Sequence, residues 1–186
     1  MFTWSKGSEA TWPIWPVTCY KMERKLFIIR HGKSSWDHEG LDDIDRPLAE
    51  RGIRNAGEMA ERLKALGLVP ELLLSSPASR ALNTALLMSK IWELGPESLQ
   101  IHEPLYMADS REIAQVIGGV PPEIRKLAIF GHNPSFTMFA NHFLPGRLDN
   151  LPTAGVVVLT LESDRWDGID RRDVKESYVD YPKKGR

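Results

Sequence analysis

The sequence predicts an α/β fold with three layers, in which helices cover both faces of a mostly parallel central sheet. Unbroken apolar runs of four or five residues recur along the chain, as is typical of strands buried on both faces. The longer segments between them repeat apolar residues every three or four positions, the period of a helix with one buried face. Strands and helices also alternate through most of the length, which favours parallel pairing of the strands.

The size of the chain favours a single domain. Its 186 residues, 42% of them hydrophobic, suffice for one good core but not for two ordinary enzyme domains. We expect this domain to span residues 22–186. Residues 1–21 contain three tryptophans and follow no helical or alternating period, so we expect an irregular amino-terminal arm. The arm is either an aromatic docking segment or the product of a start site upstream of Met22, and full activity of a chain beginning at Met22 would remove it from the mechanism.

Charge and cysteine content exclude several classes of protein. The formal net charge is −1, from 24 Lys and Arg against 25 Asp and Glu, so the basic excess of a nucleic-acid or anionic-membrane surface is missing. Cys19 is the only cysteine, which argues against a disulfide framework or a thiolate metal site and fits a cytoplasmic protein. No window approaches 18 apolar residues, and the amino terminus lacks the pattern of a secretion signal. We expect neither nucleic acid nor membrane as a partner.

The first predicted strand carries the buried run Leu26–Ile29. It ends in Arg30, His31 and Gly32, which places reactive side chains at the mouth of a crevice, followed by a residue that tolerates any backbone angle. A polar, acidic surface loop follows over residues 33–45.

The first helix is predicted to begin near Pro47, because a proline in the first helical turn lacks only an N–H that would have no partner there. It is expected to end near Gly67, a typical stop signal. Its apolar stripe consists of Ile53, Ala56, Met59, Ala60, Leu63 and Leu66.

A second buried strand over residues 71–75 leads through Ser76 and Pro77 into a helix over residues 78–94. Arg80 lies in the first turn of this helix, where the helix dipole disfavours a cation by roughly a few tenths of a kcal/mol. A bound anion would turn this unfavourable placement into a binding site.

The remaining elements continue the alternation. Asn133 is predicted to be the N-cap, and Pro134 the first residue, of a helix that begins beside His132. We expect a strand near 99–102, a helix near 110–117, a strand over 126–130, the helix from Pro134 to about Phe143, a strand over 155–161 and an edge strand over 174–181.

Four polar residues follow predicted strands at the edge where open α/β sheets bind their ligands: Arg30, His31, Arg80 and His132. Parallel pairing brings them together although the three loops lie far apart in sequence. Two guanidinium groups offer planar forks that match phosphate or carboxylate oxygens, and two helix N-termini add N–H donors. The sequence therefore predicts a pocket for a tetrahedral dianion.

The two histidines acquire a specific chemistry beside fixed cations. Nearby positive charge lowers the pKa of an imidazole below its ordinary value of roughly 6.5. A ring nitrogen of His31 or His132 then stays unprotonated at neutral pH, and a neutral imidazole is a nucleophile.

Three separated motifs resemble those of the histidine phosphatase superfamily: Arg30-His31-Gly32 after an apolar strand, Ser75-Ser76-Pro77-Ala78-Ser79-Arg80 with Thr84-Ala85 downstream, and Gly131-His132-Asn133 after a later strand. The compact length and the segment Lys33-Ser34-Ser35-Trp36-Asp37 are similar to the small SixA-type phosphohistidine phosphatases. The resemblance covers residues 25–161 and implies a phosphoglycerate mutase-like fold.

The resemblance also implies an activity. His31 would attack phosphorus in line and become phosphohistidine, which water then hydrolyses. Arg30, Arg80 and His132 would hold the phosphoryl oxygens and stabilise charge in the transition state. The family uses no metal, and we expect no cofactor. The favoured substrate is a phosphorylated histidine of a protein.

The chain departs from the family pattern at two points. Lys33 stands where mutases of the family commonly carry glutamate, and the short chain lacks their insertions, which argues against mutase activity. Many relatives use a carboxyl group after the second motif as general acid, and Glu103, Asp109, Asp37 and Asp42 all remain candidates. An imidazole leaving group departs more readily than an alkoxide, so a phosphohistidine substrate needs less proton assistance.

Three alternative functions stay open: a broad small-molecule phosphomonoesterase, a non-catalytic phosphate-binding module, and a metallophosphatase that uses His31, His132 and an aspartate. Retention of both histidines argues against the binding module, because arginines and helix ends would suffice to bind an anion. A phosphohistidine assay with chelator present separates the metal-dependent alternative from the metal-independent one. The physiological substrate and the oligomeric state do not follow from the sequence.

Overall fold

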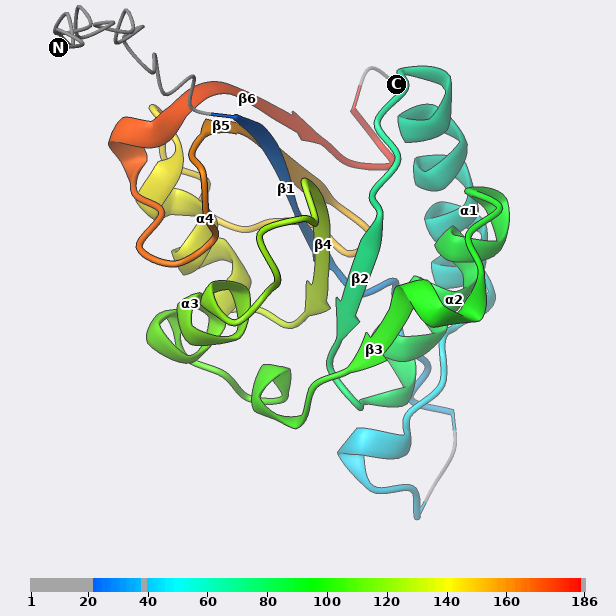
Figure 1. Ribbon diagram of the computed structural model, residues 1–186. Helices are drawn as coiled ribbons and strands as arrows, with labels where there is room; N and C mark the ends of the chain where they lie inside the picture. The colour runs from blue at the N-terminus through cyan, green and yellow to red at the C-terminus, as the bar shows by residue number, and fades with distance from the viewer. Residues whose placement is uncertain (1–21, 38–39, 185–186) are drawn as a thin grey trace, which may run out of the picture.

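The framework of the computed structural model, which describes residues 22–37 and 40–184, is a six-stranded sheet in the order β3-β2-β4-β1-β5-β6. Figure 1 shows helices on both sides of this sheet. The arm expected over residues 1–21 lies outside the described residues. The strands are β1 (Glu23–Arg30), β2 (Leu72–Ser75), β3 (Leu99–Ile101), β4 (Lys126–Gly131), β5 (Val156–Glu162) and β6 (Val174–Asp180).

Strand pairing divides the sheet into two parts. β4 pairs in parallel with both β1 and β2, and β2 pairs in parallel with β3. β5 is antiparallel to β1 and to β6, so β6 forms one edge of the sheet. The predicted mostly parallel, three-layer α/β fold and the predicted edge strand are both confirmed.

The alternating side chains of β1 supply two cores, one on each face of the sheet. Leu26 and Ile28 pack into the core beneath α3 and α4, whereas Phe27 and Ile29 pack into the core beneath α1 and α2. Among the described residues, no helix is both long enough and apolar enough to cross a membrane. The helices are α1 (Glu50–Ala65), α2 (Ser79–Ile91), α3 (Ser110–Gly118) and α4 (Ser135–Phe143), and the short 3-10 turns are η1 (Asp43–Asp45), η2 (Pro96–Ser98), η3 (Glu103–Leu105) and η4 (Arg171–Asp173).

The predicted start of α1 at Pro47 is wrong. The helix begins at Glu50, because the residues before it pair with the loop after β1: Leu48 forms an isolated antiparallel bridge with Ser34. The predicted stripe is also too wide, since Ile53 is 46% exposed and Leu66 57% exposed. The residues that α1 buries are Gly52, Ala56, Met59, Ala60 and Leu63.

Asn133 does not cap α4 as predicted. The helix begins at Ser135 with Pro134 at the N-cap position. The Asn133 side-chain amide instead donates to Asn150 Oδ1 at 2.7 Å and to the Leu151 carbonyl at 3.0 Å. The long-range partners outcompete the local cap, and they fix the loop that follows β4.

Candidate active site

One cavity of about 230 Å³ at the carboxyl ends of the parallel strands is lined by all four residues singled out from the sequence, Arg30, His31, Arg80 and His132. Arg30 ends β1, Arg80 lies in the first turn of α2, and His132 follows β4. We call this space the cationic cavity. The other residues that line it are Lys33, Ser34, Trp36, Arg46, Asn133 and Thr153.

His31 has one ring nitrogen bonded to the backbone and the other without a partner. Its Nδ1 lies 2.6 Å from the Gly32 carbonyl oxygen, which can only accept, so Nδ1 carries the proton. No described residue bonds to Nε2, which therefore holds a free lone pair. The next peptide is fixed as well, because Gly32 N–H donates to Thr84 Oγ1 at 2.9 Å.

The pKa of His31 is lowered to about 4. Burial is the main cause, and the nearby charges of Arg80, Arg30 and Arg46 lower it further, while the bond to Gly32 raises it. The imidazole is thus neutral at pH 7, as a nucleophile requires.

His132 lies beside His31, with ring centroids 5.0 Å apart and an angle of 52° between the planes. Its pKa is lowered to about 3, first by burial and then by the proximity of His31 and Arg80. Ser76 Oγ lies 2.9 Å from His132 Nε2, whereas the buried Nδ1 has no hydrogen-bond partner among the described residues.

Arg30 is held by the loop before β5. Its Nη1 donates to the Leu151 carbonyl at 2.7 Å and to Asn150 Oδ1 at 3.2 Å. Its buried Nε has no hydrogen-bond partner in the part of the chain that the structure describes. Among the described residues, the buried side-chain polar atoms without a partner are this Nε, His132 Nδ1 and Asn133 Oδ1, and all three residues line the cationic cavity. Leaving such groups unpaired costs about 1–3 kcal/mol each, so their concentration marks a ligand site.

Asp43 holds Arg80 from the side. The Arg80 Nη2 donates to Asp43 Oδ2 at 2.8 Å and the Arg80 Nη1 donates to the Asp43 carbonyl. Burial would raise the pKa of the Asp43 carboxyl, but hydrogen bonds from Arg80 and Arg46 outweigh burial and hold the pKa below its ordinary value. The carboxylate offsets the unfavourable dipole interaction of Arg80 in α2.

Arg46 is a cavity residue that the sequence analysis missed. It stacks on the Trp36 ring, with Cζ 3.2 Å from the ring centroid. Its guanidinium donates to Ser34 Oγ at 2.8 Å and to Asp43 Oδ1 at 3.0 Å. Its position before Pro47 suggested only a helix start, and no spacing rule connects it to Arg30 or Arg80.

A second, mainly apolar cleft of about 430 Å³ opens beside the cationic cavity. Arg80, His132 and Asn133 line both spaces. We call the second space the apolar cleft. Its other lining residues are Asp43, Tyr106, Met107, Ala108, Asp109, Ser110, Pro134, Ser135 and Met138.

Sequence comparison identifies the family. Residues 26–105 match the pattern of the histidine phosphatase superfamily (branch 1). This region includes Arg30, His31 and Arg80 of the cationic cavity. The chain belongs to the histidine phosphatase superfamily.

Two uncharacterized proteins are similar to this chain over most of its length. An uncharacterized protein of Picosynechococcus is 31% identical over 140 residues, which cover 73% of this chain and 84% of the relative. An uncharacterized chloroplastic protein of Arabidopsis thaliana is 29% identical over 158 residues, 78% of this chain and 70% of the relative.

Solved structures share the phosphoglycerate mutase-like fold at low identity. A candidate phosphohistidine phosphatase SixA from Nakamurella multipartitia has a TM-score of 0.73 and 19% identity, over 87% of this chain and 97% of that structure. The protein histidine phosphatase SixA complexed with tungstate has a TM-score of 0.69 and 23% identity, over 85% of this chain and 97% of that structure.

The four carboxyl groups considered as candidate general acids lie in different surroundings. Asp109 lines the apolar cleft, but it caps α3 and accepts from the backbone N–H groups of Arg111 and Glu112. Asp37 Oδ2 accepts from Ser35 Oγ at 2.7 Å. Glu103 and Asp42 line neither the cationic cavity nor the apolar cleft. The structure therefore singles out none of these four as proton donor.

The donor set of the cationic cavity does not suit a metal cation. Three arginines line it, and they would repel a divalent ion. Among the described residues, no group of three or more His, Cys, Asp or Glu side chains is arranged to hold a metal.

Proposed function

We propose that this member of the histidine phosphatase superfamily is a metal-independent phosphatase that works through a covalent phosphohistidine intermediate on His31. The observation that carries the proposal is the neutral imidazole of His31, with a bare Nε2, among the cations of the cationic cavity. A binding module needs the cations but gains nothing from a nucleophile.

The chemistry requires two displacements at phosphorus. The lone pair of His31 Nε2 forms the new N–P bond while the bond from phosphorus to the leaving group breaks, and the leaving group takes the electron pair and then a proton. Water next attacks the phosphorus of phosphohistidine, the N–P bond returns its electrons to Nε2, and phosphate leaves with the oxygen of water. Arg30 and Arg80 balance the charge on the phosphoryl oxygens during both steps, and the neutral ring of His132 stabilises these oxygens by a hydrogen bond.

The favoured substrate is a phosphohistidine side chain of a protein. The leaving group would lie in the apolar cleft, where Met107 is 80% exposed and Met138 is 63% exposed. Flexible, exposed thioethers suit an irregular polypeptide surface. Among the described residues that line this cleft, Arg80 is the single Arg or Lys, and it also lines the cationic cavity. The cleft therefore offers no further cation for the second anionic group of a small phosphorylated acid.

Trapping the intermediate tests the proposal. A phosphohistidine-containing protein, mixed with the enzyme in the presence of a chelator, should yield an acid-labile phosphoenzyme and release phosphate. His31→Ala should abolish both signals, whereas His102→Ala, outside the cationic cavity, should retain them. Undiminished turnover by His31→Ala, or activity lost on chelation alone, would overturn the mechanism.

The alternative of a small-molecule phosphomonoesterase is tested with the same enzyme. We expect kcat/KM for a phosphohistidine protein to exceed that for small phosphomonoesters by at least about tenfold, which corresponds to about 1.4 kcal/mol of transition-state stabilisation. Higher kcat/KM values for the small phosphomonoesters would reverse the assignment of substrate and leave the role of His31 intact.

A further inference from the structure

A chain of hydrogen bonds leads from the start of α2 into the cationic cavity. The backbone N–H of Ala78, the N-cap residue of α2, donates to Ser76 Oγ at 3.3 Å. Ser76 Oγ in turn lies 2.9 Å from His132 Nε2. Ser76 is fully buried, so its hydroxyl group bonds to protein groups rather than to solvent.

The hydrogen-bond donors and acceptors around Ser76 determine which group donates in the bond between Ser76 Oγ and His132 Nε2. If Ser76 donates its hydroxyl proton, it accepts from Ala78 and donates to His132 Nε2, so both capacities are used. If His132 donated from Nε2 instead, the Ser76 hydroxyl proton would have no acceptor, and the bare Nδ1 of His132 would have no donor among the described residues. The first arrangement leaves one fewer buried polar group without a partner, and such an unpaired group costs about 1–3 kcal/mol.

We propose that Ser76 is a positioning residue that fixes the tautomer of His132, so that Nε2 is the acceptor and Nδ1 carries the proton. This inference rests on the proposed function of the cationic cavity. The neutral state that burial imposes on His132 makes the choice of tautomer consequential, because a neutral ring has a single N–H to place.

The tautomer decides how His132 interacts with an anion. An Nδ1–H group that has no partner among the described residues attracts a phosphoryl oxygen, whereas a bare Nδ1 would present a lone pair and repel it. His31 carries its proton on Nδ1 as well, but there the backbone carbonyl of Gly32 takes it and Nε2 is left bare. Two imidazoles in the same tautomer are thereby given opposite roles by their partners, one as nucleophile and one as hydrogen-bond donor.

The direct test is the protonation state of His132 in the intact protein. In long-range proton–nitrogen spectra of protein labelled with 15N-histidine, we expect the His132 ring to be protonated on Nδ1 and bare on Nε2 at pH 7. The signals that His132→Gln removes assign this ring. Protonation on Nε2 in the wild type would overturn the proposal, whatever the variants do.

Two serine variants separate positioning from packing. Ser76→Ala should mix the two tautomers of His132 and weaken binding of inorganic phosphate or tungstate about tenfold. Ser75→Ala removes a hydroxyl of the same size from the neighbouring, equally buried residue, whose Oγ donates to the Ser76 carbonyl. It should leave the tautomer in place and change anion affinity less than about twofold.

A third variant and the choice of measurements test the role of Ser76 independently of the proposed phosphatase activity. Ser76→Thr, which keeps the hydroxyl, should restore protonation on Nδ1. An unchanged tautomer and unchanged phosphate affinity in Ser76→Ala would contradict the proposal. Since spectra and anion binding need no turnover, a protein that shows the expected tautomer but hydrolyses nothing would refute the phosphatase and leave the role of Ser76 standing.

Discussion

Single side chains decide which donors of the cationic cavity reach a ligand. Arg80 presents one edge of its guanidinium to Asp43, and this leaves its other N–H groups for the cavity. Asp43 also takes a hydrogen bond from Arg46 and a longer one, at 3.2 Å, from the Tyr106 hydroxyl. One exposed carboxylate thus connects residues of the cationic cavity and of the apolar cleft.

We predict that Asp43→Asn releases Arg80 and Arg46 and weakens binding of inorganic phosphate about tenfold. Loss of a carboxylate close to the cavity would strengthen anion binding if only net charge mattered, so the direction of the change is informative. Titration calorimetry measures it. Asp45→Asn, which makes the same charge change in the same 3-10 turn, is the matched control and should stay within about twofold of wild type.

Protonation of the two cavity histidines should make the protein sensitive to acid. Their native pKa values, about 4 for His31 and about 3 for His132, lie below the ordinary 6.5. At a pH between the native and the ordinary pKa values, these histidines bind protons in the unfolded chain but not in the native chain. The histidines therefore make their full contribution to the free energy of unfolding above about pH 6.5, and this contribution falls as the pH drops toward 4. At about 1.4 kcal/mol per pKa unit, the loss is a few kcal/mol.

Urea unfolding at pH 7 and pH 4.5 measures this loss. In His31→Asn the free energy of unfolding should fall less between the two pH values than in the wild type. An equal fall in both proteins would show that other groups cause the acid sensitivity.

The sequence placed Arg30, His31, Arg80 and His132 at one edge of the sheet, because each follows a buried strand and parallel strands end together. Their roles remain predictions. Ser76 also follows a buried strand, but only its contact with His132 gives it a role. Arg46 and Asp43 could not be found in this way. Their contribution depends on which way a loop folds back over the cavity, and loop geometry follows no sequence period.

At the level of elements, the approach of α1 to the loop after β1 shapes the wall of the cationic cavity. Ala49 N–H donates to the Lys33 carbonyl at 2.8 Å, and a Cβ at Gly52 would lie 2.2 Å from the same oxygen. Glycine at this helix position therefore permits a backbone contact that any side chain would prevent.

We predict that Gly52→Ala lowers the free energy of unfolding by at least about 1–3 kcal/mol, because the added Cβ forces the backbone of Lys33 to shift. Gly57 is the matched control in the same helix. A Cβ there lies 3.7 Å from Ile91 Cδ1, an ordinary contact, so Gly57→Ala should be neutral or stabilising by up to about 1 kcal/mol. Thermal unfolding followed by circular dichroism compares the two, and equal melting temperatures would contradict the close approach.

Element boundaries show where sequence patterns reach their limit. The cores of α1 and α2 follow from their apolar period, and Gly67, with φ of +70°, follows α1 as a stop residue should. The start of α1 was misplaced because Leu48 pairs with Ser34, and the cap of α4 was misplaced because Asn133 bonds to a distant loop. In each case a tertiary contact outweighed the local preference.

On the scale of the whole molecule, a buried arginine joins the ends of three segments opposite the cationic cavity. Arg24, at the start of β1, is only 2% exposed and stacks on Trp166. Its guanidinium donates to four backbone carbonyls at 2.5 to 3.0 Å, those of Pro122, Ile124, Ser163 and Asp164. These carbonyls belong to the loop before β4 and the loop after β5.

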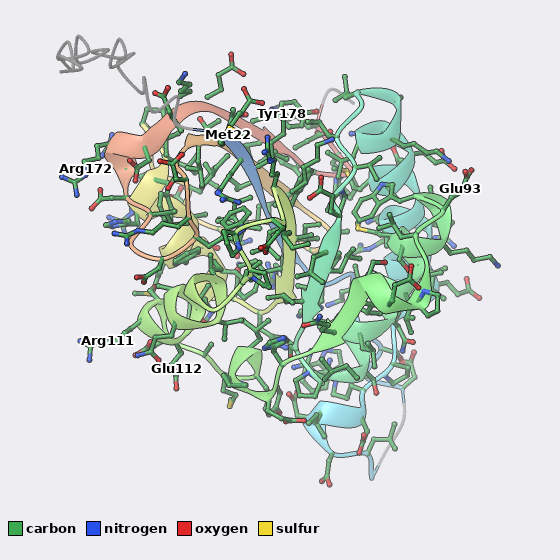
Figure 2. All side chains as sticks on the ribbon, viewed as in Figure 1. Met22, Glu93, Arg111, Glu112, Arg172 and Tyr178 are labelled. Carbon is green, nitrogen blue, oxygen red and sulfur yellow. The ribbon has the colours of Figure 1, made fainter. Side chains whose placement is uncertain are left out.

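We predict that Arg24→Met lowers the free energy of unfolding by about 3–5 kcal/mol, because several buried carbonyls lose a charged donor. Arg111→Met is the control, since Arg111 points outward at the surface (Figure 2) and should cost less than about 0.5 kcal/mol. Urea unfolding gives both values. An Arg24→Met protein as stable as the control would refute the assigned role.

The antiparallel part of the sheet places one loop where a label can be attached far from the cationic cavity. Because β5 runs against β1, the loop between β5 and β6 lies at the amino-terminal end of β1, whereas His31 follows the carboxyl end. Gly168 in that loop adopts a left-handed conformation with φ of +69°, and a Cβ at this position would meet no described atom within 4 Å. A fluorescent label or a tether to a solid support attached there would leave the mouth of the cationic cavity clear for even a bulky protein.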